Sequence, residues 1–451
     1  MSDKKQLGGL IKRALLAICI ALAIAGAAIA CLYGQQGFWL YQSISGFKSF
    51  QNCRFDEAEK HAVSAVDTAR RLKNNTDQLS MSLNLLAEIY MVQGKHEQAL
   101  SAIQESLKSA EDRAGKEDPS LIAPLSLLGG YYRRLGQYDQ AKAAYTRGLA
   151  IARKRGITDK RIVVVLEPLA KLDSFLGRTD EADTLFQQAY QISKKEDGPE
   201  SIAAANCLLG LGEVEEARAH YLQAEKLYSQ SADIHEKLNG HDDPDLSMTL
   251  DHLVRLYISA DNLARAEPSA WRALRLKEDG LAALKDSHYH ADINLATIYM
   301  DRDLTTAAEP LIENAITLSG SRSSKTHPYY ANALALKALL LCHKKQFQEA
   351  DAVYDQAWKV MTASVGKKHR YLARLLVCRA QMDVLEGKTD RARKDFEEAL
   401  SMADSVLPAD HPERARIMRR MALFLEENGD RTKATALKKQ AEAIVAHAYE
   451  S

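Results

Sequence analysis

The chain has few of the residues that build sheets and no excess of charge of either sign. Only ten of its 451 residues are proline and 7% are aromatic. Runs of Val, Ile and Thr are scarce, which disfavours a sheet-rich fold and favours helices. Lys and Arg together number 60, and so do Asp and Glu, so no overall charge attracts nucleic acid. We expect an all-α protein without a nucleic-acid partner.

Signals for chemistry are also missing. The six cysteines include no C-x-x-C pair, so neither a disulfide framework nor a zinc site is indicated. No G-x-S-x-G, H-E-x-x-H or dinucleotide-binding motif occurs. We therefore predict that the protein is not an enzyme and has no catalytic residues, cofactor or metal.

One long apolar run stands out, at residues 14–33. It carries no charge over twenty residues, which as a helix would span roughly 30 Å, the thickness of a bilayer core. Four basic residues precede it, at positions 4, 5, 12 and 13, and the next basic residue after it is Lys48. By the positive-inside rule, residues 1–13 form a short cytoplasmic N-terminus and the rest is extracytoplasmic.

Two alternatives for this segment stay open. Ala28–Cys31, "AIAC", has the small residues of a signal-peptidase site, so the segment could be cleaved and the body secreted. It also loosely resembles a lipoprotein box, with Cys31 as the lipid-anchored residue. The favoured interpretation is an uncleaved single-pass anchor, because a signal-peptide core is usually shorter. The body is extracytoplasmic in all three cases.

The remainder of the chain repeats itself every 41–42 residues. Leu86–Leu107 aligns without gaps to Leu128–Leu149. The same register gives one alanine per repeat: Ala58, Ala99, Ala141, Ala182, Ala224, Ala266, Ala308, Ala350, Ala392 and Ala434. Two further columns of mostly small residues lie twelve positions before and seven after these marker alanines, and a large apolar residue lies four after in most repeats. Small residues let paired helices approach closely, and the large residue fills the space between pairs.

A turn is expected five residues before each marker alanine. Five repeats have a glycine there, which readily adopts the left-handed backbone that ends a helix: Gly94, Gly136, Gly177, Gly387 and Gly429.

These columns resemble those of tetratricopeptide repeats, as do the tyrosines of the first helix, such as Tyr90 and Tyr132. The 42-residue step is longer than the common 34. With Glu-Pro in the second helix and His-Pro between repeats, it is similar to the variant found in kinesin light chain. The resemblance implies a right-handed α-solenoid of ten helix pairs over residues 39–446, after a linker at 34–38 and before a tail at 447–451.

A column of histidines 42 residues apart precedes the first helices of the last three repeats. His327, His369 and His411 follow the same register as Asp243, and a proline follows three of these four residues. An acceptor side chain before a proline is typical of a helix N-terminus. Metal ligands must converge on one point, whereas these residues lie one repeat apart, so we interpret them as helix caps.

The expected binding surface is the concave groove lined by the first helices. The resemblance and the repeat register together give seven candidate basic residues: Arg133, Lys171, Arg255, Arg374, Arg416, Arg419 and Arg420. They alternate with acidic residues, which suits a charged or polar peptide, and the arginines near the C-terminus favour an acidic one. In peptide-binding members of the family, groove asparagines hold the ligand backbone. Asn294, Asn84 and Asn332 occupy such positions here, whereas most repeats have Leu, Ile, Cys or Arg, so the ligand preference of kinesin light chain is not carried over.

The sequence therefore predicts a membrane-tethered, non-catalytic scaffold that binds a protein or peptide in its groove. The alternatives are a self-assembling structural component of the cell envelope and a secreted or lipid-anchored form of the same scaffold.

Overall fold

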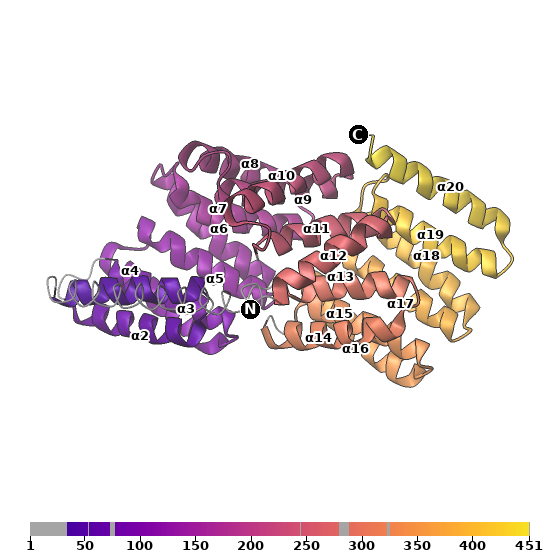
Figure 1. Cartoon of the computed structure of the whole chain (residues 1–451), viewed down its shortest axis with the longest axis horizontal. Coiled ribbons are helices and arrows are strands. Elements are labelled where there is room, and N and C mark those ends of the chain that lie inside the picture. The colour runs from indigo at the N-terminus through magenta and orange to yellow at the C-terminus, as the bar shows by residue number, and fades with distance from the viewer. Residues whose placement is uncertain are drawn as a thin grey trace, which may run out of the picture. The chain divides into compact units, whose positions relative to one another are not determined.

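The computed structural model describes residues 34–52, 54–72, 77–243, 245–278, 288–322 and 325–450. Every regular element in these ranges is helical, as the sequence predicts (Figure 1). Within them no helix is long and apolar enough to cross a membrane. The apolar run predicted to do so, residues 14–33, lies outside the described residues, as does the preceding 1–13.

The helices come in pairs, one pair for each repeat, and residues 34–51 form the first helix of repeat 1. The first helices of repeats 2–10 are α3 (Gln78–Val92), α5 (Ile122–Arg134), α7 (Lys160–Phe175), α9 (Ile202–Ala217), α11 (Leu246–Ser259), α13 (His288–Asp301), α15 (Pro328–His343), α17 (Arg370–Leu385) and α19 (Pro412–Glu427). The second helices of repeats 1–10 are α2 (Phe55–Arg71), α4 (His96–Ala114), α6 (Tyr138–Lys154), α8 (Thr179–Glu196), α10 (Tyr221–Asn239), α12 (Leu263–Glu278), α14 (Thr305–Arg322), α16 (Phe347–Val365), α18 (Thr389–Val406) and α20 (Arg431–Ala448). A short 3₁₀ helix, η1 (Pro119–Leu121), precedes α5.

The chain divides into two compact parts, Met1–Leu127 and Leu128–Ser451, with the boundary inside α5. In the N-terminal part, residues 34–38, expected as a linker, are helical and continuous with the helix that ends at 51. Trp39 on this helix donates from Nε1 to the Ser82 hydroxyl at 2.8 Å.

The small-residue columns hold the helix pairs together throughout both parts. All ten marker alanines are at most 1% exposed, and the residues of the two flanking columns are buried as well. Tyr145 lies directly on Gly129, where an added Cβ would come within 2.4 Å of the ring, and Tyr228 lies on Gly212 in the same way. The pairing of a small residue with a large one sixteen positions later therefore explains the spacing of the columns.

In repeats 2–10 the turn inside the pair uses the left-handed backbone even where glycine is absent. The five predicted glycines have φ between 71° and 88°. Four other repeats place a residue with a side chain at the same position, with φ between 58° and 69°: Ala219, Asp261, Asp303 and Lys345. The turn geometry is thus set by the packing of the helices, and these four residues adopt it at a cost in backbone energy.

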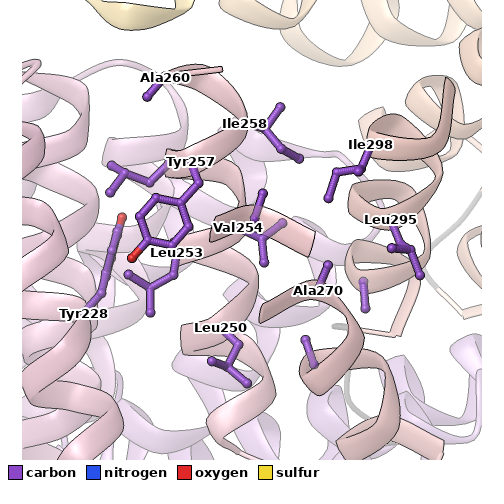
Figure 2. Close-up of a cluster of buried hydrophobic side chains, with 14 of the residues drawn as sticks. Tyr228, Leu250, Leu253, Val254, Tyr257, Ile258, Ala260, Ala270, Leu295 and Ile298 are labelled. Atoms are coloured by element: carbon purple, nitrogen blue, oxygen red, sulfur yellow. The ribbon is translucent and has the colours of Figure 1, made fainter. Parts of the chain in front are cut away.

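A continuous core runs along the stacked pairs. Figure 2 shows part of it, where Val254 and Tyr257 of α11 lie between Tyr228 of α10 and Leu295 of α13. At the end of the chain, Lys438 occupies the large apolar column, remains partly exposed and pairs with Glu426 at 2.5 Å. The C-terminal end of the same helix, α20, contributes Ala448, and Tyr449 beside it, to the cluster around Tyr221.

The histidine column caps helices, as predicted. The Nδ1 atoms of His327, His369 and His411 accept hydrogen bonds from the backbone N–H two residues later, at 3.3, 3.2 and 3.1 Å. Asp243 accepts from the N–H of Asp245 at 3.0 Å. Burial lowers the pKa of both His369 and His411 to about 4, which keeps each ring neutral and able to accept.

Repeats far apart in sequence also meet inside the C-terminal part. The carbonyl oxygens of Leu135 and Phe175, near the C-terminal ends of α5 and α7, accept hydrogen bonds from Thr326 at 3.1 Å and His369 at 3.0 Å. Arg370 lies 3.6 Å from Glu216 of α9. Repeats 3–5 therefore contact the start of repeats 8 and 9, and the solenoid turns back on itself.

Candidate functional site

The first helices of repeats 6–10 enclose a cavity of about 120 Å³. Alternate helices α11, α13, α15, α17 and α19 contribute its walls. A second hollow of about 30 Å³ adjoins it and shares Arg255, Ile293, Asn294, Asn332 and Arg374 with it. The repeat places equivalent positions of successive first helices side by side, and so gathers residues about 42 apart in sequence on one surface.

Four of the seven candidate basic residues line this cavity: Arg255, Arg374, Arg416 and Arg420. Asn294 and Asn332 line it as well, whereas Asn84 of α3 accepts a hydrogen bond from the Ser106 hydroxyl at 2.8 Å. The other three candidate basic residues do not line it.

Arg419 turns to the end of α11, where it lies 3.4 Å from the Ala260 carbonyl and 3.7 Å from Asp261. Lys171 donates to Glu167 on its own helix, α7, at 2.5 Å. Arg133 of α5 interacts with the buried Tyr145 hydroxyl. These three residues are therefore separate from the cavity.

The two arginines of α19 that line the cavity are paired with the chain's own carboxylate. Arg416 donates to Asp301, the last residue of α13, at 2.7 Å, and Arg420 pairs with the other carboxylate oxygen. Burial alone would raise the pKa of Asp301, but the two guanidinium groups hold it below its usual range. One carboxylate therefore offsets half of the charge of these two arginines before any partner binds.

A second network of charges lies at the side of the cavity. Glu216 accepts from Arg255 at 3.1 Å and from the Tyr228 hydroxyl at 2.8 Å. Glu413 pairs with Arg374 and lies 3.7 Å from Arg370. Burial raises the pKa of Glu413, but the two arginines outweigh burial and lower it to about 2. Both carboxylates are thus charged at neutral pH and each joins two arginines.

The sequence interpretation missed Asp301 and Glu413 as partners of the groove arginines. The sequence did contain a signal for Asp301, which lies in the last turn of α13, as Glu216 does in α9. The helix dipole disfavours a negative charge there, so an acidic residue at that position points to a cationic partner elsewhere.

Several polar atoms at the cavity remain available. Among the described residues, no group hydrogen-bonds the terminal nitrogens of Arg374, and the Asn332 and Gln381 amides have no partner. Arg416 Nε and Glu413 Oε2 also make no hydrogen bond, but both atoms are fully buried, and Glu413 Oε2 lies 3.7 Å from Arg370 Nε. Leu336 and Leu339 are among the apolar residues of the wall. The cavity can therefore hold a small group with both donors and acceptors next to an apolar body.

Two features of the described residues bear on metal binding and on nucleophilic chemistry. Across the described ranges, no cluster of three or more His, Cys, Asp or Glu residues is arranged to hold a metal ion. Burial raises the pKa of the Cys378 thiol, which lines the cavity, to about 12, so it is not an activated nucleophile.

Comparison with known proteins identifies the repeat. A family model for the tetratricopeptide repeat matches residues 77–154, 162–231 and 371–446. The Arabidopsis thaliana protein KINESIN LIGHT CHAIN-RELATED 3 is 25% identical over 334 residues, which cover 71% of this chain and 49% of that protein. KINESIN LIGHT CHAIN-RELATED 1 from the same plant is 26% identical over 252 residues, covering 55% and 40%. The chain thus spans half or less of the length of these relatives.

A solved structure has the same kind of fold. NprR, crystallised in complex with its cognate peptide NprX, superposes with a TM-score of 0.53 at 10% identity. The match covers 80% of this chain and 97% of that one. At this identity the similarity concerns the fold alone.

Proposed function

Because this chain is a tetratricopeptide-repeat protein with kinesin-light-chain-like repeats, we propose that it is a non-catalytic scaffold that binds a protein or peptide segment through the cavity of repeats 6–10. The observation that carries the proposal is the set of unsatisfied polar atoms on that surface. Polar groups on a partly buried surface normally have partners, and among the described residues the Asn332 and Gln381 amides and the terminal nitrogens of Arg374 have none. A peptide backbone supplies both the donor and the acceptor that these atoms lack.

The sequence predicts an acidic partner, and the charges of the cavity favour a partner with a single anionic group. Four arginines line the cavity against two carboxylates, Asp301 and Glu413, which leaves an excess of positive charge. Because Arg416 and Arg420 already share Asp301, the excess favours one anionic group rather than a run of acidic residues. NprR, whose structure contains a bound peptide, offers a precedent for ligand binding within this fold class.

Tethering to a membrane is the second element of the proposal. It rests on the sequence of residues 14–33, uncharged and preceded by basic residues. In this arrangement the solenoid lies outside the cytoplasm as a single-pass membrane protein. Protease shaving of intact cells tests it: digestion of the C-terminal part without cell lysis is expected, and full protection would contradict this topology.

Site-specific photo-crosslinking tests the scaffold function. A photoreactive amino acid at Leu336, in the cavity wall, is expected to capture a partner chain in cells. The same amino acid at Lys359, exposed on the second helix α16, is the matched control and should not. Capture only from Lys359, or from neither position, would contradict binding in the cavity. Crosslinks from Leu336 to a second copy of this chain would instead support the self-assembling role.

A further inference from the structure

The first helix of repeat 1, residues 34–51, carries an exposed apolar stripe. Leu40, Ile44 and Phe47 are 43%, 57% and 51% exposed. Their spacing of four and then three residues places them on one side of the helix. A single exposed apolar side chain is ordinary, but three large ones along one helix form a surface that normally meets an apolar partner.

The stripe lies where later repeats pack on the repeat before them. Ile44 stands two residues before the small residue Gly46, and Leu85 and Gly210 hold the same register in repeats 2 and 5. A Cβ added to Gly46 would lie 3.4 Å from Leu85, and one added to Gly210 would lie 2.1 Å from Phe186 of α8. This register therefore faces the preceding repeat, and among the described residues no repeat precedes the helix 34–51.

The other side of this helix is fixed to the N-terminal part. Trp39 is hydrogen-bonded to Ser82 of α3, and Gln42 Oε1 lies 2.6 Å from His61 Nδ1 of α2. Gly46 is buried between the same two helices. The helix therefore cannot rotate to bury the stripe in its own core.

The helix begins next to the uncharged run at residues 14–33. Gly34, its first residue, has φ of 58°, a left-handed conformation that interrupts a right-handed helix, so the helix is able to lie at an angle to what precedes it. At a rise of about 1.5 Å per residue, Leu40 and Phe47 lie within about 10 and 20 Å of residue 33. The proposed membrane anchor thus brings the stripe to the surface of the bilayer.

A basic side chain accompanies the stripe. Lys48 follows Phe47, is exposed, and makes no ion pair among the described residues. Helices that lie in a membrane interface combine Leu and aromatic side chains with lysines in this way. The long lysine side chain extends along the apolar surface and places its charge near lipid phosphates.

Two other occupants fit the stripe less well. Second helices such as α2 expose charged side chains to water, whereas residues 14–33 carry no charge, so this run lacks the polar side that a preceding second helix needs. A second copy of this chain, packed stripe to stripe, would bury three large side chains from each copy, which is too few for the roughly 1,000 Å² of a stable interface.

We propose that the helix 34–51 lies on the extracytoplasmic surface of the membrane, with Leu40, Ile44 and Phe47 inserted among the lipid headgroups and Lys48 beside a lipid phosphate. This inference rests on the proposed membrane tether and adds a second contact to it. A tether alone leaves the N-terminal part free to rotate above the bilayer, whereas the stripe fixes which side of repeat 1 faces the lipid.

Fluorescence quenching by lipids tests this with the full-length chain, reconstituted into phosphatidylcholine vesicles that contain doxyl-labelled lipid. A fluorescent amino acid at Ile44 is expected to lose about half of its emission, because the doxyl group lies at the depth that an interfacial helix reaches. The same amino acid at Ser101, exposed on α4, is the matched control and should lose little. No quenching at Ile44 in the vesicle-bound chain, or equal quenching at both positions, would overturn the proposal.

A double variant tests whether the stripe itself holds the helix on the lipid. With the fluorescent amino acid at Leu40, replacing both Ile44→Gln and Phe47→Gln should reduce the quenching at least twofold. Val63→Gln, which removes another exposed apolar side chain, on α2, should leave it unchanged.

Circular dichroism checks that the double variant is folded, and the comparison of the Ile44 and Ser101 labels stands even where it unfolds. Unchanged quenching in the folded double variant would contradict the proposal.

Photo-crosslinking separates the lipid from the other occupants. A benzophenone amino acid at Ile44 should form an adduct with phosphatidylcholine, detected by mass spectrometry. An adduct with a second copy, or with residues 14–33 of the same chain, would overturn the proposal.

Flotation of the vesicles separates this inference from the tether. If the chain floats with the vesicles and the Ile44 label is not quenched, the tether stands and the surface contact is wrong. If the chain does not float, the tether is wrong and the surface contact fails with it.

Discussion

His369 and Phe175 lie 194 residues apart and are joined by one hydrogen bond, from His369 Nε2 to the Phe175 carbonyl at 3.0 Å. The other ring nitrogen, Nδ1, accepts from the N–H of Tyr371. One neutral imidazole therefore caps the start of α17 and satisfies the last carbonyl of α7. Protonation at Nδ1 would remove the acceptor and break the cap, so the solenoid depends on this ring staying neutral.

This dependence predicts acid sensitivity. The pKa values of His369 and His411 are about 4 in the folded chain, against about 6.5 in an unfolded one. Between these two pH values the unfolded state binds more protons than the folded state. The free energy of unfolding should therefore fall as the pH drops from about 6.5 to 4, by about 1.4 kcal/mol per pH unit for each ring. Urea unfolding at a series of pH values measures this.

His411→Asn isolates one of the two rings. Asparagine keeps an acceptor for the cap but does not titrate, and the His411 Nε2 atom makes no hydrogen bond that would be lost. The variant should unfold with a shallower dependence on pH in this window. His343→Asn, at a position near the end of α15 that caps no helix start, is the control. An unchanged slope for His411→Asn would contradict the account.

The left-handed turns predict a stabilising substitution. Lys345 has φ of 61° and an exposed side chain, so Lys345→Gly should relieve backbone strain and raise the free energy of unfolding by about 1 kcal/mol. Lys359→Gly, in the exposed interior of α16, should lower it by about 1 kcal/mol. Thermal or urea unfolding measures the change in the free energy of unfolding for both variants. A Lys345→Gly variant that is less stable than the unchanged chain would show that the turn is not strained.

Close packing at the marker alanines predicts the cost of overfilling. Ala308→Leu places a larger side chain where the alanine is fully buried and should destabilise the chain by about 1–3 kcal/mol. Ala307→Leu, one residue earlier and exposed, should have little effect. Equal effects at the two positions, measured by urea unfolding, would argue against the column as a packing contact.

The ion pairs across the solenoid predict a large effect at one carboxylate. Asp301→Asn removes the partner of both Arg416 and Arg420 and should cost about 3 kcal/mol, because two half-buried guanidinium groups lose their counter-charge. Asp303→Asn removes an exposed carboxylate two residues later, at a φ that asparagine tolerates. Similar unfolding midpoints for the two variants would mean that the pairs contribute little.

Some of these structural features could be predicted from the sequence. The marker alanines recur in every repeat, and the turn glycines and histidine caps recur in several of them, so these spacings predicted the helix pairs, the caps and the turns. They even located the turns at Ala219 and Lys345, where no glycine marks them. Local patterns carry this information because each depends on neighbours within one or two repeats.

The pairing of Arg416 with Asp301 could not be predicted from the repeat pattern. It joins residues 115 apart, and whether they meet depends on the pitch accumulated over several repeats, which no single repeat encodes. The same applies to Tyr449, predicted to lie in a tail, which packs against Tyr221. The sequence therefore identified the arginines of the cavity but treated them as open to a ligand, although all four are already paired with carboxylates of the chain.

Hydrogen–deuterium exchange on the full-length chain, alone and with the partner captured through Leu336, tests the central claim most directly. Binding in the cavity predicts slower exchange in α15 and α17, which line it, with α16 between them in sequence unchanged. Slower exchange confined to α16 and α18, or none in any first helix of repeats 6–10, would contradict it.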